Sequence, residues 1–204
     1  MIVLIVSNCL KCFRVGVKAA ATAVFTLTIP LASAQFSSLS RPEKIWAVFH
    51  PFAAMKVRRI SHECDRIYDE PGNRGELDAY SAGGKLDAWR HVLYMAAFAQ
   101  KVKTNKVRKL GQAHEKGNYL QFRKGGLEEG ERPDSLSSVM DLLNNELGIA
   151  IGCNNHAAPL NALSEMTIQA IHDGKAWIFL RDRSGAYLTC EGIKIDMDQH
   201  AGKW

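Results

Sequence analysis

The sequence predicts a mainly α fold, a single helical-bundle domain with a small β-hairpin near its C-terminus. Apolar residues recur at alternating spacings of three and four over most of the chain, as they do on buried helix faces. Turn-forming residues separate these periodic segments. Two short β-prone stretches, 176–180 and 186–190, follow only at the end. With 204 residues, the chain is long enough for one ordinary domain.

Residues 1–34 are predicted to be a secretory signal peptide. Their basic part holds three cations: Lys11, Arg14 and Lys18. An apolar run, 19–31, and a small-residue cleavage site ending at Ala34 follow. The run is shorter than the roughly 20 residues of a membrane span. We therefore expect cleavage, a periplasmic or secreted protein and no stable membrane span afterwards; an uncleaved anchor is the less favoured alternative.

Charge and cysteine content narrow the classes of partner. The chain has 26 Lys plus Arg against 21 Asp plus Glu, but three of the cations lie in the acid-free signal peptide. The remainder is close to neutral, which disfavours nucleic acid as a partner. Three cysteines remain in the mature chain: Cys64, Cys153 and Cys190. Two of them can pair in an oxidising compartment, and none lies in a nucleophile motif.

The domain is predicted to span 35–204 and to begin with two consecutive helices. Ser40 is expected to cap the first, with Pro42 in its first turn, and Pro51 to break or restart the helix. An apolar face then follows: Ala53, Val57, Ile60, Cys64 and Ile67. Turn chemistry at 70–73 ends this element.

The remaining helices are expected at 85–102, from a cap at Thr104 or Asn105 to 122, from a cap at Asp134 or Ser135 to 151, and from beyond Pro159 to Gly174. Segment 124–132 is charged and glycine-rich and should be a loop. The hairpin, 175–191, is expected to cover the helical core with two side chains: Trp177 and Phe179.

Ionisable residues interrupt the apolar pattern of helix 85–102. Four polar residues share one of its faces: Asp87, Arg90, His91 and Tyr94. The rest of the circumference is apolar, so the helix should be largely buried. Buried charges are costly unless they are paired or used.

Helix 135–151 shows a similar pattern. Asp141, Asn144, Asn145 and Gly148 share a face, and a separate apolar stripe holds Met140, Leu143 and Leu147. Gly148 costs a helix about 1 kcal/mol relative to Ala. It therefore indicates either a close helix approach or room for a ligand.

Helix 104–122 contributes the third set of polar residues. Val107, Leu110 and His114 follow one face, so His114 should point into the core with Glu115 beside it. Three helices would then direct titratable groups at one interior, as helix bundles do when they build metal or acid–base sites. Taken singly, each group is explained by capping or an ion pair; the combination favours a functional site.

The segments DAWRH (87–91), AHE (113–115) and MDLLNNELG (140–148) resemble an uncharacterised bacterial domain family with DAxRHxxW, HE and MDLxNNxxG motifs, common in secreted and toxin-like proteins. The match covers 86–152, and Tyr94 stands where the family often has Trp. The resemblance implies a single site with no established activity, and a toxin role would add an immunity partner. The implied site residues are Asp87, Arg90, His91, His114, Glu115, Asp141, Asn144 and Asn145.

We expect a hydrolase that uses acid–base catalysis for attack by water on an unknown substrate in the cell envelope or outside the cell. The expected catalytic residues are His91, His114, Glu115 and Asp141. The expected orienting or substrate-binding residues are Asp87, Arg90, Tyr94, Asn144 and Asn145. These motifs hold no Ser or Cys, which disfavours a covalent intermediate.

Three alternatives stay open. A divalent metal on His91, His114, Glu115 and Asp141 is less favoured, because no HExxH occurs and Arg90 would repel a cation; no cofactor is therefore expected. A non-enzymatic binding or interaction module would use the polar groups as a structural network. A basic run, 101–109, is expected to be a solvated helix junction, with contact to an anionic surface such as lipid or DNA as the lesser alternative.

Overall fold

The computed structural model of the chain describes residues 36, 38–70, 75, 77–78, 80–125 and 135–196. The chain divides into two compact units, Met1–Leu39 and Ser40–Trp204, and the fold described here is that of the second. The predicted signal peptide and its cleavage site lie outside the described residues. Among the helices that are described, none has the length and apolar character needed to cross a membrane.

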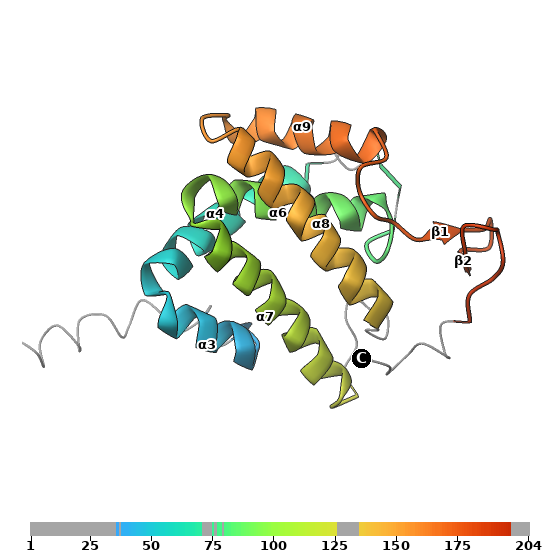
Figure 1. Ribbon diagram of the computed structural model, residues 1–204, viewed down its shortest axis with the longest axis horizontal. Coiled ribbons are helices and arrows are strands. Elements are labelled where there is room, and N and C mark those ends of the chain that lie inside the picture. Colours follow the sequence, from blue (N-terminus) through green and yellow to red (C-terminus); the bar gives the residue numbers. More distant parts are fainter. Residues whose placement is uncertain are drawn as a thin grey trace, which may run out of the picture. The chain divides into compact units, whose positions relative to one another are not determined.

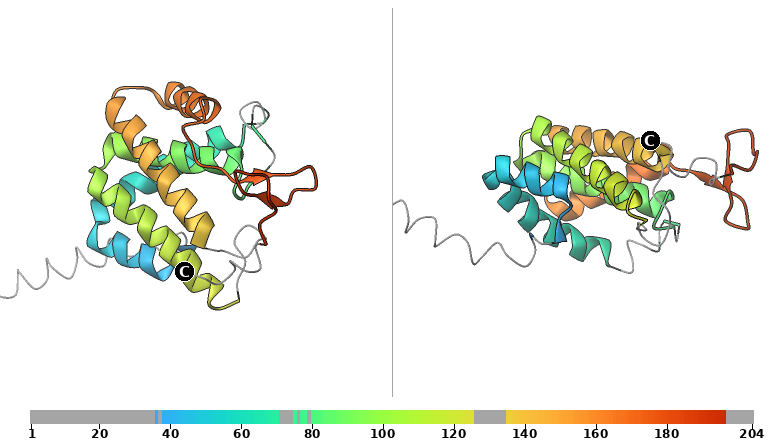
Figure 2. Two further views of the ribbon diagram at one scale, coloured as in Figure 1. Left: turned by 45° about the vertical axis from the view of Figure 1, so that its right-hand side comes forward. Right: turned by 90° about the horizontal axis from the view of Figure 1, so that it is seen from below.

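Six helices and a hairpin make up the described part of this unit (Figure 1). The helices are α3 (Arg41–Phe49), α4 (Pro51–Tyr68), α6 (Lys85–Lys101), α7 (Thr104–Phe122), α8 (Ser135–Asn154) and α9 (Leu160–His172). Strand β1 (Leu180–Arg181) pairs antiparallel with β2 (Tyr187–Leu188). Figure 2 shows the hairpin projecting from the helices. The mainly α fold with a small C-terminal hairpin is confirmed.

The start of α3 follows the predicted capping chemistry. The Ser40 side chain accepts a hydrogen bond from the Glu43 backbone N–H at 3.4 Å, and the Glu43 carboxylate accepts one from the Ser40 N–H at 2.8 Å. This reciprocal pair is a capping box, which satisfies two backbone donors at the helix end. Pro51 occupies the first turn of α4, so the helix restarts there as predicted.

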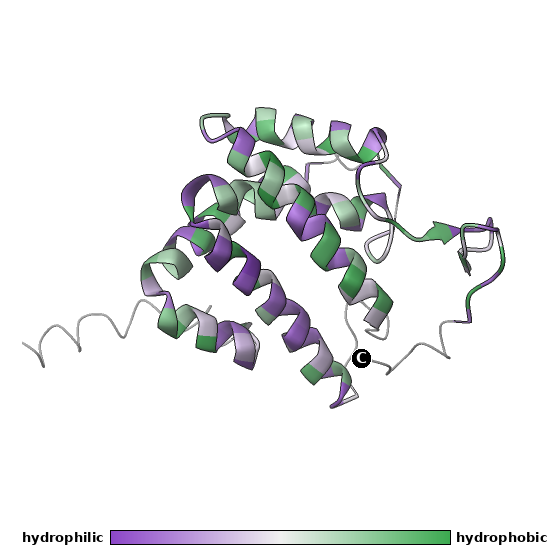
Figure 3. Cartoon of the chain, in the orientation of Figure 1, coloured by the Kyte–Doolittle hydropathy of each residue, from purple (hydrophilic) through white to green (hydrophobic). Residues whose placement is uncertain are grey.

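Helix α6 is the centre of the bundle and packs against α4, α8 and α9. Its Trp89, Val92 and Leu93 side chains are fully buried. Trp89 stacks on Tyr68 of α4 and donates its indole N–H to Thr167 Oγ1 of α9 at 3.0 Å. Figure 3 shows the contrast with α7, which is largely hydrophilic on the side in view.

Two glycines of α8 allow its backbone to approach α6. A Cβ added to Gly148 would lie 2.4 Å from the Val92 carbonyl oxygen, and one added to Gly152 would lie 2.1 Å from that of Ala96. Real Cβ atoms do not approach a backbone oxygen so closely. Gly148 therefore serves a close helix approach rather than making room for a ligand. Helix α8 continues to Asn154, past the predicted end at 151.

The hairpin segment fixes the turn that precedes α6. Arg181 donates to the Ala82 carbonyl at 2.7 Å, and the Phe179 N–H donates to the Gly83 carbonyl at 2.8 Å. Gly83 has a φ of +69°, a backbone conformation that glycine adopts without strain. The hairpin segment thus holds in place the turn at Ala82 and Gly83, which leads directly into the first turn of α6.

Several local predictions were wrong. Lys103, without a side-chain hydrogen bond, precedes α7, so neither Thr104 nor Asn105 caps it. The strands have two residues each, and β2 also forms an isolated antiparallel bridge from Leu188 to Lys194. The Trp177 side chain is 59% exposed and does not cover the core; its backbone makes the contact instead.

Candidate functional site

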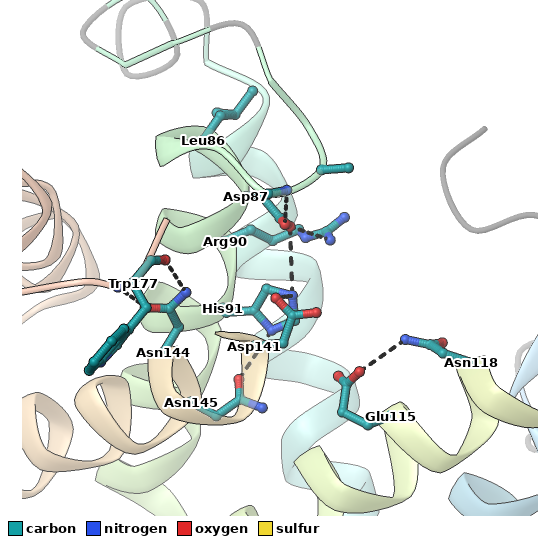
Figure 4. A network of polar contacts seen from close by, with 12 residues as sticks. Leu86, Asp87, Arg90, His91, Glu115, Asn118, Asp141, Asn144, Asn145 and Trp177 are labelled. Carbon is teal, nitrogen blue, oxygen red and sulfur yellow. Dashed lines mark hydrogen bonds and ion pairs between the residues drawn. The ribbon is translucent and has the colours of Figure 1, made fainter. Parts of the chain in front are cut away.

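Helices α6 and α8 bring three ionisable residues together: Asp87, His91 and Asp141, the Asp–His–Asp cluster (Figure 4). Asp87 and His91 lie one turn apart on α6, and Asp141 faces them from α8. His91 Nε2 lies 3.3 Å from Asp141 Oδ1 and 3.7 Å from Asp87 Oδ1. All three side chains are buried. The sequence prediction that these residues share one interior is confirmed.

Hydrogen bonds orient the cluster from outside. His91 Nδ1 lies 3.1 Å from Asn145 Oδ1. Asp87 accepts the Gly83 backbone N–H on Oδ2 and Arg90 Nη2 on Oδ1, both at 2.8 Å. An amide oxygen can only accept, so this contact is a hydrogen bond in the His91 tautomer that carries its proton on Nδ1. In that tautomer, His91 Nε2 presents its lone pair to the carboxylates.

Burial dominates the electrostatics of the cluster. Desolvation raises the pKa of Asp87, and the charge of Arg90 and the Gly83 hydrogen bond only partly oppose this. Desolvation also lowers the pKa of His91 well below its ordinary value, and the charges of Arg90 and His114 act in the same direction. His91 is therefore a neutral imidazole at neutral pH in the metal-free protein.

The cluster has the composition of a metal site. One ligand atom from each of Asp87, His91 and Asp141 lies within 4.8 Å of the other two, and among the described residues this is the set of His, Cys and carboxylate groups that meets that condition. It keeps His91 and Asp141 from the four metal ligands considered in the sequence analysis. Asp87 takes the place of His114 and Glu115, because it lies one helical turn from His91 on the same face.

Glu115 and His114 exchange the positions predicted for them. Glu115 is buried and accepts from Ser138 Oγ at 2.9 Å and Asn118 Nδ2 at 3.4 Å. Its side chain extends from α7 toward α6 and α8 (Figure 4). The His114 side chain is 45% exposed, 3.0 Å from Glu43 Oε1, with its ring centroid 6.5 Å from that of His91. The prediction that His114 points into the core was wrong.

The reason lies in the buried face of α7. This face runs through Val107, Gly111, Glu115 and Asn118, whereas Leu110 lies at its edge. Gly111 makes room for Asn145, since a Cβ there would lie 2.8 Å from Asn145 Nδ2. That Nδ2 is a buried donor that finds no acceptor among the described residues.

Two predicted orienting residues lie outside the cluster. Asn144 donates to the Trp177 carbonyl and accepts the Trp177 N–H, both at 2.9 Å, so its amide holds the hairpin segment and is not available to a substrate. The Tyr94 hydroxyl donates to Asp65 of α4. Burial and the Asp65 carboxylate raise the Tyr94 pKa above its usual range. Arg90, by contrast, lies at the cluster, with its side chain 26% exposed.

Sequence reasoning missed Gly83, Gly111 and Ser138. Two of them, Gly83 and Ser138, had a local indication in the sequence. Gly83 precedes the acidic first turn of α6, where backbone N–H groups lack helical partners and bind carboxylates. Ser138 precedes Asp141 by three residues and so shares its helix face. The role of Gly111 depends on the packing of α7 against α8 and has no counterpart in the sequence pattern.

The three described cysteines form no disulfide. Cys64 is fully buried, and desolvation raises its pKa to about 12. A thiol with so high a pKa is not a nucleophile at neutral pH. Cys64 therefore serves as a core residue.

The Glu43–His114 pair predicts a pH dependence of stability. Burial favours the neutral acid, but the hydrogen bond and charge of His114 and the bonds to Ser40 outweigh it, so the pKa of Glu43 is lowered. Because its folded-state pKa is lowered, ionised Glu43 stabilises the fold at pH values above the ordinary carboxyl pKa of about 4.3. This stabilisation is lost as the pH falls below that value and through the folded-state pKa. Urea unfolding across this range should show a smaller loss of stability in Glu43→Gln than in wild type. Parallel curves would contradict the assignment.

Comparison with known proteins shows the family but no activity. No curated protein and no solved structure matches the chain. The model of a family described as a domain of unknown function matches residues 44–175, which include α4, α6, α7, α8, α9 and the whole cluster. This match agrees with the resemblance to an uncharacterised family. The chain therefore belongs to the domain-of-unknown-function family DUF6973.

Proposed function

We propose that the protein is a hydrolase in which Asp87, His91 and Asp141 hold a divalent cation that activates a water molecule. The observation that carries this proposal is the convergence of three buried ligand atoms within 4.8 Å of one another. The proposal reverses the order in which the sequence ranked the two hydrolase variants. It does so because the structure replaces two of the four ligands considered earlier.

The geometry leaves a place for a positive species. With its proton on Nδ1, His91 directs a lone pair at the oxygens of Asp141 and Asp87, 3.3 and 3.7 Å away. Three electron-rich atoms facing one another in a buried space repel unless a proton or a cation lies between them. Two ligands bound tetrahedrally to Zn²⁺ at about 2.0–2.1 Å lie about 3.4 Å apart, close to both distances.

The surroundings match those of metal ligands. Metal-bound histidines commonly donate their second ring N–H to an oxygen, and metal-bound carboxylates are themselves hydrogen-bonded. His91 meets Asn145 in this way, and Asp87 meets Gly83 and Arg90. Arg90 does not forbid a cation, because two carboxylates lie at the cluster against its single charge.

The remaining groups fit hydrolysis. Three protein ligands leave a fourth position for water, as in catalytic zinc sites, where the metal lowers the pKa of that water. Arg90 is partly exposed beside Asp87 and suits an anionic group of the substrate or the negative charge that develops on it. Glu115 is the nearby carboxylate left to accept a proton. The predicted signal peptide supports placing this activity in the periplasm or outside the cell.

Calorimetric titration of chelator-treated full-length protein with Zn²⁺ or Mn²⁺ tests the site. We expect one equivalent to bind to wild type and the affinity to fall at least about 100-fold in Asp141→Asn and Asp87→Asn, since loss even of outer ligand partners costs 10–100-fold. Glu146→Gln is the matched control on α8, because Glu146 is exposed and pairs with Arg108. The absence of stoichiometric binding, or equal binding by Asp141→Asn, would contradict a cation held by the cluster.

A hydrolysis assay on phospholipid vesicles, peptidoglycan and nucleic acid tests the activity. We expect hydrolysis of one substrate class to require the added metal and to be lost in Asp141→Asn but not in Glu146→Gln. Activity that survives a chelator would restore the metal-free acid–base variant. A folded protein that is inactive on all three substrates, with circular dichroism unchanged, would favour the binding module.

A further inference from the structure

Helices α3 and α4 expose five large apolar side chains around the junction between them. Their exposed fractions are 51% for Ile45, 66% for Val48, 74% for Phe49, 81% for Phe52 and 70% for Met55. Ile45, Val48 and Phe49 share one face of α3, and Phe52 and Met55 share one face of α4. We call this surface the apolar corner.

The apolar corner is not the core side of these helices. Trp46 and Ala47 of α3, and Ala53, Ile60 and Cys64 of α4, are already buried. Contiguous exposed apolar surface on a soluble domain marks an interaction site. Phe49 and Phe52 are the most exposed of the five and flank the junction at His50.

Cations border the apolar corner at both ends. Arg41 and Lys44 lie one turn before Ile45 and Val48, on the same face of α3, and Lys56 and Arg59 follow one turn after Phe52 and Met55 on α4. Between 41 and 62 the only acid is Glu43, whose carboxylate is bonded to Ser40 and His114, and the next acid, Glu63, pairs with Arg59 at 3.9 Å.

The fold adds cations from a distant segment. The Lys56 ammonium donates to the carbonyl of Lys101 at 3.3 Å, and the Trp46 indole N–H donates to that of Lys106 at 3.0 Å. These contacts place the basic turn between α6 and α7 beside α3 and α4. The exposed Lys101 and Lys103 thus join the basic border.

We propose that the apolar corner docks on an anionic lipid membrane, with Phe49 and Phe52 entering the boundary between headgroups and acyl chains. Helices that lie on membranes combine aromatic side chains on one side with Lys and Arg that reach the headgroups. Each cation near such a surface contributes to binding, and salt screens that contribution. A second copy of the chain is a poorer occupant, because a symmetric contact would bring like-charged borders together. The proposal is independent of the cation site.

A tryptophan placed in the apolar corner reports contact of that surface with lipid, separately from any contribution of residues 1–39 to binding. Full-length Phe52→Trp is added to vesicles of equal parts phosphatidylglycerol and phosphatidylcholine. We expect its additional tryptophan emission, relative to wild type, to shift to the blue and to be quenched by brominated lipids. Val139→Trp is the matched control, since Val139 of α8 is 54% exposed and outside the corner. Equal quenching of Phe52→Trp and Val139→Trp would overturn the proposal. So would the absence of quenching in both variants if the protein still sediments with the vesicles.

Variants then separate the apolar from the charged contribution. We expect Phe52→Ser to weaken partitioning at least about tenfold, the lower bound for exposing one large apolar side chain. Lys56→Gln should weaken it about fivefold on anionic vesicles only. Unchanged partitioning in both variants, or a wild-type dimer that dissociates in Phe52→Ser, would assign the corner to another occupant and refute lipid docking.

Discussion

Gly152→Ala is expected to lower the free energy of unfolding by about 2–3 kcal/mol, although alanine favours helices over glycine by about 1 kcal/mol. The added methyl would lie 2.1 Å from the Ala96 carbonyl oxygen and 2.8 Å from its carbon. These are backbone atoms, so relief requires α8 to move away from α6. Urea unfolding measures the change. A domain is stable by only about 5–15 kcal/mol, so this loss is a large share.

The matched control is the opposite change, from alanine to glycine, on the exposed side of α8. Ala150 is exposed on α8, and Ala150→Gly should cost about 1 kcal/mol through helix propensity alone. If propensity governed both positions, Gly152→Ala would stabilise the protein, and that result would contradict the close packing. The same displacement would separate Asp141 from His91, so Gly152→Ala should also weaken cation binding.

Trp89→Ala is expected to cost about 4 kcal/mol, within the usual range for removing a buried aromatic side chain. Trp89 is fully buried where α4, α6 and α9 meet, and the change removes both the ring stacked on Tyr68 and the donor to Thr167. Urea unfolding again provides the measurement. Trp89→Phe keeps a ring but loses the N–H, so it should lie between Trp89→Ala and wild type.

Trp177→Ala is the control for this experiment. Its side chain is 59% exposed, and the contact with Asn144 uses the Trp177 backbone, which alanine retains. The free energy of unfolding should change by no more than about 0.5 kcal/mol, as for most surface substitutions. A cost comparable to that of Trp89→Ala would show that the Trp177 side chain covers the core after all.

The sequence predicted those parts of the fold that depend on local interactions. Ser40 caps α3, Pro51 restarts a helix, and α6 spans nearly the predicted residues. The shared face of Asp141, Asn144, Asn145 and Gly148 is buried as predicted. Helical periodicity determines such faces, and the chemistry of a cap or a proline acts within a few residues.

Predictions about contacts between elements were less complete. Asn144 and Asn145 are adjacent and both buried, yet the first bonds to Trp177 and the second to His91. His114 and Glu115 are also adjacent, and only Glu115 enters the interior. A rotation of α7 by a fraction of a turn decides which of them is buried, and that rotation depends on how α3 and α8 pack against it.

By itself, the sequence determined which residues are helical, which faces are apolar and that polar groups on three helices interrupt these faces. Only the tertiary structure decided that Asp87 rather than His114 joins His91 and Asp141, and that a basic turn borders the apolar corner. Helical periodicity follows from neighbouring residues, whereas the meeting of two side chains depends on the distance and angle between helices. Here small residues such as Gly148 and Gly152 set that distance.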